Sequence, residues 1–187
     1  MSEVAANSSS QAAGEQQELF AEQPLVPEDA GYRAPVVAKL VGITYRQLDY
    51  WARTGLVEPS LRTASGSGSQ RLYNFRDIVT LKIVKRLLET GVTLQQIRTA
   101  LDHLRDSGVS DLSQITLMSD GSSVYECRSP EEVFDLVHGG QGVFGIAVGA
   151  VWREVETDLA SLPAERADGS VTVVDDELSR RRARKIG

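Results

Sequence analysis

The chain is poor in residues that form covalent or metal cross-links. It contains one cysteine, Cys127, and two histidines, His103 and His138, in 187 residues. A single cysteine cannot form a disulfide within the chain, and these three residues have none of the spacings typical of a zinc or thiolate site. We therefore expect a reducing compartment, no bound metal and no iron–sulfur cluster. Cys127 is expected to be a small buried hydrophobe.

Long apolar runs are also missing. No segment approaches the roughly 20 apolar residues of a membrane-spanning helix, and the N-terminus lacks the basic and then apolar pattern of a secretory signal. The sequence therefore predicts a cytoplasmic protein with no membrane partner. With 41% hydrophobic and 25% charged residues, the composition is that of an ordinary globular protein with one medium domain or two small ones.

No arrangement of residues indicates an enzyme. The glycine-rich stretch at residues 139–145 is followed by no Lys-Ser or Lys-Thr pair, so it does not fit a phosphate-binding loop. Glu131, Glu132 and Asp135 fit the N-terminal part of a helix better than an acid–base pair. We find no nucleophile paired with a base, and we predict no catalytic residue and no cofactor.

Positive charge is absent from residues 1–30 and concentrated directly after them. Residues 31–105 carry 12 Lys/Arg against 5 Asp/Glu, a net charge of +7, whereas the rest of the chain carries 8 against 21, a net charge of −13. Charges attract phosphates over a Debye length of about 8 Å, so the local sign matters more than the total. A basic module therefore lies within an acidic chain, and nucleic acid is not excluded as a partner.

The residues from 31 to 106 have the signals of a winged helix-turn-helix domain. Gly42 separates two short helices, and Thr44 is placed to cap the second of them. A Gly/Ser-rich tip at residues 63–69 lies within a predicted hairpin, the wing. The elements are expected in this order: helices at 34–41 and 44–54, the wing at 56–73, and helices at 74–91 and 93–108.

The remainder predicts a small α+β domain over residues 110–163. A hairpin is expected around Asp120-Gly121, and Ser129-Pro130 begins a helix that runs to about His138. Residues 143–148 fit a buried strand and the beginning of a helix equally well. Residues 1–30 and 164–187 are expected to be disordered tails, the first acidic and the second with a basic end.

A short apolar seam lies near the end of the predicted C-terminal domain. Its residues recur at the a and d spacing of a coiled coil, and with the family resemblance given below we expect this seam to form a dimerisation helix. The alternative is that this face closes the C-terminal domain itself. The seam consists of Val148, Trp152, Val155, Leu159 and Leu162.

One face of the second helix has the side chains that DNA recognition needs. Arg46 lies near its N-terminal end, where base contacts usually arise, and Arg with guanine is the commonest such pair. Trp51 fits the core better, whereas Tyr50 fits the core and a phosphate contact equally well. The candidate DNA contacts of this helix are Tyr45, Arg46, Tyr50 and Arg53.

The wing supplies a second set of candidate DNA contacts. Arg62 and Arg71 flank its tip, one on each strand, where they are placed to straddle a phosphate or enter a minor groove. Tyr73 follows Arg71 at period two, so both side chains are expected on one face. Arg33, Lys39 and Arg76 are further candidates for phosphate contacts, although Lys39 fits a solvated face best.

These residues and their spacing resemble the MerR family of bacterial transcription regulators over about Tyr32–Leu104. The Tyr-Trp pair and the Gly/Ser-rich wing resemble an actinobacterial subgroup. By this resemblance, Arg46, Tyr50, Arg71 and Tyr73 inherit DNA-contact roles. The matching positions are Arg46, Tyr50-Trp51, Gly55-Leu56, Arg71, Tyr73, Gly91, Thr93, Leu94 and Ile97.

The sequence departs from the family pattern in the recognition helix and the wing. Asp49 stands where the family often has Arg, which removes one expected phosphate contact. Gln70 replaces a frequent aromatic residue, and the tip Thr63–Ser69 is longer than usual. The family places its dimer helix directly after the DNA-binding module, whereas here a hairpin and a helix intervene before the seam.

The resemblance implies a transcription regulator associated with the nucleoid. Family members bind near-palindromic operators as homodimers, and many act with RNA polymerase by bending and untwisting promoter DNA, which costs roughly 1–6 kcal/mol for a comparable bend. The alternatives are an architectural or excision-type DNA-binding protein with the same winged helix, or a chromosome-organising protein, whose long coiled coil is missing here. The effector, if there is one, is not evident from the sequence.

Overall fold

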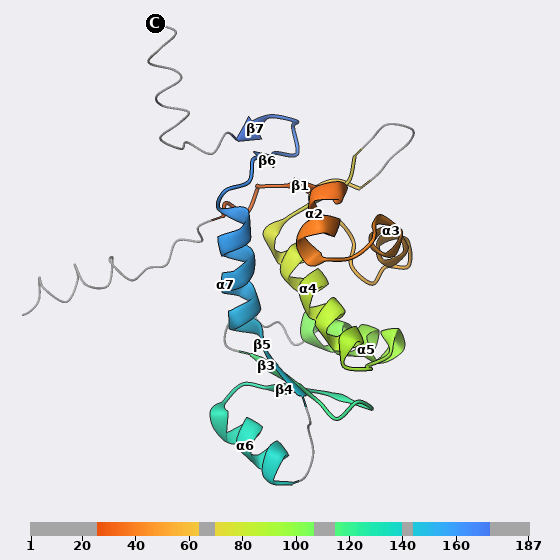
Figure 1. Cartoon of the computed structure of the whole chain (residues 1–187), viewed down its shortest axis with the longest axis vertical. Coiled ribbons are helices and arrows are strands. Elements are labelled where there is room, and N and C mark those ends of the chain that lie inside the picture. The colour runs from red at the N-terminus through yellow and green to blue at the C-terminus, as the bar shows by residue number, and fades with distance from the viewer. Residues whose placement is uncertain (1–25, 64–69, 107–114, 140–143, 173–187) are drawn as a thin grey trace, which may run out of the picture.

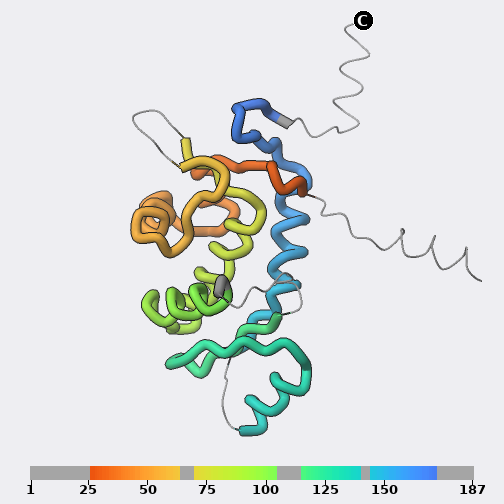
Figure 2. Tube along the Cα trace, turned by 180° about the vertical axis from the view of Figure 1, so that it is seen from behind, coloured from red at the N-terminus to blue at the C-terminus, as the bar shows by residue number. Residues whose placement is uncertain are grey.

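A computed structural model describes residues 26–63, 70–106, 115–139 and 144–172 of the chain. The predicted tails up to residue 25 and from residue 173, and most of the wing tip, lie outside these ranges. The described residues combine helices with small antiparallel sheets (Figures 1 and 2). The elements of the N-terminal half are β1 Tyr32–Arg33, α2 Ala34–Val41, α3 Tyr45–Arg53, β2 Leu72–Tyr73, α4 Phe75–Glu89 and α5 Leu94–Asp106.

Local capping explains where the helices of this half begin. The Thr44 hydroxyl accepts a hydrogen bond from the Gln47 amide, and the Gln47 side chain accepts one from the Thr44 amide. Asn74 and Asp77 form the same reciprocal pair at the start of α4. Such pairs satisfy backbone N–H groups that a helix leaves open. Gly42 ends α2 with φ 75°, a conformation that glycine adopts without strain.

The C-terminal half contains a three-stranded sheet in the order β4-β3-β5. The hairpin expected around Asp120-Gly121 is confirmed, because β3 and β4 pair antiparallel on either side of it. Residues 144–148, left open by the sequence, form a strand that passes into a helix. Figure 1 shows α6 below the sheet and α7 returning alongside α4. The elements are β3 Thr116–Ser119, β4 Val124–Cys127, α6 Pro130–His138, β5 Phe144–Ala147, α7 Val148–Leu159, β6 Ala164–Glu165 and β7 Val171–Thr172.

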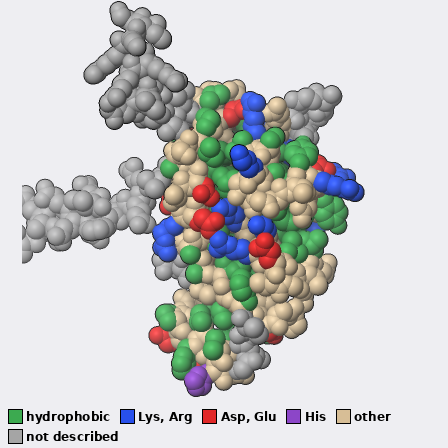
Figure 3. All heavy atoms as spheres, in the orientation of Figure 1, with side chains coloured by type: hydrophobic (Ala, Val, Ile, Leu, Met, Phe, Trp, Pro, Cys, Tyr) green, Lys and Arg blue, Asp and Glu red, His purple; other side chains and the backbone are tan. Residues whose placement is uncertain are grey.

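The two halves share one hydrophobic core, because α7 packs along α4. Trp152 of α7 meets Phe75 of α4 edge to face, with ring centroids 4.4 Å apart. Lys82 of α4 is only 8% exposed, and its ammonium lies 2.7 Å from carboxylate oxygens of both Glu154 and Asp158. Figure 3 shows such basic and acidic side chains gathered side by side over α4 and α7. The helices are therefore joined by apolar packing flanked by ion pairs.

The packing of α7 differs from the dimer seam expected of it. Val148, Val155 and Leu159 are buried within a single chain, and Trp152 and Leu162 are partly buried against the same core. The face that carries the seam is thus occupied by α4. The sequence left this alternative open, but it did not indicate that the partner would come from the N-terminal half.

The expected boundaries of both tails are wrong by several residues. Val26 and Ala30 are buried in the core, although residues 1–30 were expected to be disordered. Residues 164–172, expected to belong to the second tail, form the β6–β7 hairpin. Gly31 and Glu165 exchange two backbone hydrogen bonds of 2.8 Å. A Cβ atom at Gly31 would lie 2.7 Å from the Glu165 carbonyl oxygen, so only glycine fits this junction.

Candidate nucleic-acid interface

Helix α3 divides into a buried face and an exposed face. Leu48 and Trp51 are buried, which confirms the core role predicted for Trp51. Tyr45 and Tyr50 are 57% and 47% exposed, and Arg46 between them is exposed as well. Helix α3 lies on the side of the molecule away from α7 (Figure 1). The face expected to contact DNA is therefore directed to solvent.

Arg46 differs from the other candidate arginines in having no ion-pair or hydrogen-bond partner among the described residues. It is the second residue of α3, which begins at Tyr45 after the N-cap Thr44. A free guanidinium at this place has five N–H donors available for a base edge or a phosphate.

Asp49 joins the recognition helix to the wing. One carboxylate oxygen accepts a hydrogen bond of 2.7 Å from Arg71, and the other accepts one of 2.8 Å from Arg53. The hydrogen bond from Arg71 is the largest cause of a lowered pKa at the Asp49 carboxyl, followed by the bond from Arg53. Arg71 is only 16% exposed in this arrangement. Asp49 thus does more than remove a phosphate contact, because it also holds two predicted DNA contacts.

Glu165 forms an ion pair with Arg62, the arginine on the other strand of the wing. Its Oε1 lies 3.2 Å from Arg62 and its Oε2 lies 2.6 Å from Arg33. Arg62 also donates to the carbonyl oxygens of Arg166 and Ala167 at 3.3 and 3.0 Å. The hydrogen bond from Arg33 is the main cause that lowers the pKa of the Glu165 carboxyl. Arg33 and Arg62 are therefore brought together by a carboxylate.

Tyr73 is the predicted DNA contact that the structure contradicts. Its side chain is fully buried, because β2 is covered on both faces and both of its residues are buried. The alternation of side chains along a strand indicates which residues share a face. It does not indicate whether that face is exposed to solvent or buried. Burial raises the pKa of Tyr73 to about 12. Its hydroxyl has no hydrogen-bond partner in the described part of the chain.

Two interactions around this surface were not predicted from the sequence. Glu165 lies in a polar segment after Pro163 that has no periodicity or motif, so no local signal indicates that it pairs with the wing. Arg98 of α5 donates a hydrogen bond of 2.8 Å to the carbonyl oxygen of Thr54, the residue that ends α3. This bond links α5 to the recognition helix.

Other kinds of site are not formed by the described residues. Within the ranges that the structure describes, no three His, Cys, Asp or Glu side chains are grouped to hold a metal ion. Cys127 is buried, and this burial is the largest cause that raises the pKa of its thiol. None of the helices in the described part of the chain is both long and apolar enough to span a membrane.

The helix pair, the exposed arginine on α3 and the adjoining wing define a protein of the winged helix-turn-helix class. Residues 32–104 match the family described as MerR HTH family regulatory protein. The chain is 59% identical over 174 residues to an uncharacterized HTH-type transcriptional regulator of Mycobacterium tuberculosis, covering 90% of this chain and 77% of that protein. The chain therefore belongs to the MerR family of transcription regulators.

More distant relatives share a smaller part of the chain. A heavy metal-dependent transcription regulator of Rhizobium meliloti is 38% identical over 65 residues, which are 35% of this chain and 42% of that protein. The nodulation protein NolA of a Bradyrhizobium species is 34% identical over 76 residues, 41% of this chain and 31% of that protein. Each of these two matches covers less than half of this chain.

Proposed function

We propose that this protein binds a near-palindromic promoter operator as a homodimer, in the cytoplasm and on the nucleoid, and bends and untwists the DNA for RNA polymerase. The observation that carries the proposal is the solvent-directed face of α3, where Arg46 is exposed and unpaired among the described residues. Tyr45 and Tyr50 flank it with hydroxyls suited to phosphates. The proposal includes no catalytic step, cofactor or metal.

The homodimer is proposed from symmetry rather than from the seam. A near-palindromic operator presents two half-sites about 34–36 Å apart, and two copies of one helix read them. The seam of α7 is packed against α4, so the second copy is expected to contact another surface. Analytical ultracentrifugation with and without operator DNA measures this directly, and a protein that binds the operator one copy at a time would contradict it.

Chromatin immunoprecipitation with sequencing tests the DNA-binding part and supplies the operator. We expect a few promoter-proximal sites, whereas occupancy across the genome would favour an architectural protein. For the operator so found, Arg46→Ala is expected to weaken specific binding by about 1–3 kcal/mol, the usual loss of a bidentate base contact.

Arg153→Ala is the matched control for this variant, because Arg153 is an exposed arginine on α7, away from α3. It should bind the operator as the wild type does. If Arg46→Ala retains the same sites with the same affinity, α3 is not used as proposed. Fluorescence resonance energy transfer between the operator ends measures the proposed bend.

A further inference from the structure

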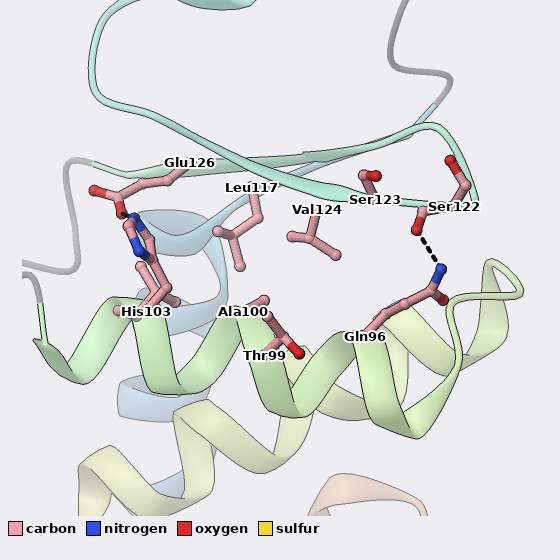
Figure 4. A pocket seen from close by; sticks show the side chains of 10 residues that line it. Gln96, Thr99, Ala100, His103, Leu117, Ser122, Ser123, Val124 and Glu126 are labelled. Atoms are coloured by element: carbon pink, nitrogen blue, oxygen red, sulfur yellow. Dashed lines mark hydrogen bonds and ion pairs between the residues drawn. The ribbon is translucent and has the colours of Figure 1, made fainter.

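A hollow of about 440 Å³ lies between α5 and the β3–β4 hairpin, within the roughly 300–1,000 Å³ of small-molecule sites. Figure 4 shows side chains of α5 directed toward the strands, with one polar link at each end of the hollow. At one end the Gln96 amide donates to the Ser122 carbonyl. At the other end, His103 lies below Glu126. The apolar lining between them comes from Ala100, Leu104, Leu117 and Val124.

Glu126 has a buried oxygen with no donor. Its side chain is 9% exposed, and its Oε1 accepts a hydrogen bond of 2.6 Å from Arg128. Its Oε2 is buried and accepts no hydrogen bond from any residue that the structure describes. The nearest candidate, His103 Nε2, lies 3.8 Å away, too far for a hydrogen bond. A buried carboxylate oxygen without a donor is unfavourable, so this end of the hollow is suited to a ligand that donates.

The charges around Glu126 favour a cationic ligand. A second hollow adjoins the same His103 and Glu126 and is lined by Glu132 and Asp135 as well. Arg128 is the basic residue among the described lining residues, and it already donates to Glu126. Carboxylates therefore outnumber fixed cations here, which disfavours an anion and attracts an ammonium group.

We propose that the hollow between α5 and the β3–β4 hairpin binds a small ligand with an ammonium group on an apolar body. The ammonium donates a hydrogen bond to Glu126 Oε2, and the apolar body lies along Leu117 and Val124. The exposed His103 ring moves aside to admit the ammonium group. The ligand thereby supplies the donor that Glu126 lacks.

Helix α5 connects this site to the recognition helix. Gln96, Thr99 and His103 face the hollow, while Arg98 on the same helix donates to the Thr54 carbonyl at the end of α3. A ligand that displaces α5 therefore changes the support of α3. This consequence, unlike ligand binding itself, rests on the proposed DNA-binding function.

Isothermal titration calorimetry of the full chain tests the site with three probes of one shape. The probes are 2-phenylethylamine, 2-phenylethanol and phenylacetate, at millimolar concentration. We expect the amine to bind, the alcohol to bind at least about tenfold more weakly, and phenylacetate not to bind, because only the amine provides a charged donor. Wild-type protein that binds no amine, or binds phenylacetate as tightly, overturns the proposal.

Two variants and one control locate the site. Glu126→Gln keeps the side-chain shape and is expected to weaken amine binding at least about tenfold. Ala100→Phe fills the hollow from α5 without changing Glu126 and is expected to abolish binding. Glu131→Gln removes an exposed carboxylate from the first turn of α6 and should change nothing. Unchanged amine affinity in Glu126→Gln overturns the assignment.

The two proposals fail separately. Amine binding that depends on Glu126 in a protein that binds no DNA would leave the ligand site standing and refute the regulator. Normal operator binding with no amine binding would support the regulator and refute the ligand site. Where both hold, the amine is expected to change operator affinity in the wild type and leave it unchanged in Glu126→Gln.

Discussion

Asp49 shows how one acidic residue in a recognition helix engages the arginines beside it in ion pairs. The carboxylate lies among Arg53 and Arg71 and pairs with both. Where the resemblance to the family leads one to expect an arginine, this chain has an internal counter-ion. If Arg53 and Arg71 contact DNA as predicted, the phosphates compete with Asp49 for these two side chains, and the basic face is then weaker than its sequence charge implies.

Asp49→Asn is therefore expected to strengthen DNA binding. The neutral amide releases Arg53 and Arg71, and each new phosphate contact steepens the slope of log K against log salt by about 0.9. Fluorescence anisotropy over a salt series measures both effects. Glu58→Gln removes a nearby exposed carboxylate and should leave the slope unchanged. Weaker binding by Asp49→Asn would mean that Asp49 orients the two arginines for DNA.

Removing the Tyr73 hydroxyl is expected to leave DNA binding unchanged, unlike the Asp49 substitution, since this hydroxyl is buried and unpaired in the described structure. Tyr73→Phe is expected to keep operator affinity and to leave the free energy of unfolding unchanged or raise it by about 1–3 kcal/mol, because an unsatisfied buried hydroxyl is removed. Urea unfolding and an operator titration measure the two quantities. A clear loss of affinity with unchanged stability would restore Tyr73 as a DNA contact.

At the scale of elements, α7 contributes mainly to stability. Leu159 is buried against the core that α4 and α7 share. Leu159→Ala should lower the free energy of unfolding by about 2–5 kcal/mol without changing the number of copies per particle. Val171→Ala, on an exposed side chain, should stay within about 0.5 kcal/mol. If Leu159→Ala dissociated a dimer at unchanged stability, the seam would be intermolecular after all.

Elements with local signals were predictable from the sequence, and those without them were not. The caps at Thr44 and Asn74 join residues three apart, so both helix starts follow from the sequence. The strands β1 and β6 have two residues each, too few to show a period. Glu165 meets Arg33 across 132 positions, and no local pattern records such a pair. The exposed face of α3 could therefore be predicted from the sequence, whereas the ion pairs that hold the wing arginines could not.

At the scale of the whole molecule, the C-terminal hairpin places a counter-ion, Glu165, against Arg33 and Arg62. Glu165 is expected to release Arg33 and Arg62 when it is replaced by Gln, which should raise DNA affinity and steepen the salt dependence by about 0.9 for each phosphate gained. Glu156→Gln removes the same charge from α7 and should have no such effect. An unchanged slope in Glu165→Gln would show that the Arg166 and Ala167 carbonyls suffice to hold Arg62.

The backbone junction between Gly31 and Glu165 also has a consequence for synthesis. A ribosome that adds about 5–20 residues per second needs about 4–15 s to go from the end of α4 at Glu89 to Glu165. Until α7 and then Glu165 are synthesised, the nascent winged helix lacks the helix that covers α4 and the strand residue that pairs with Gly31. Its apolar flank is then open to chaperones, and Arg33 and Arg62 have no counter-ion until the last strands emerge.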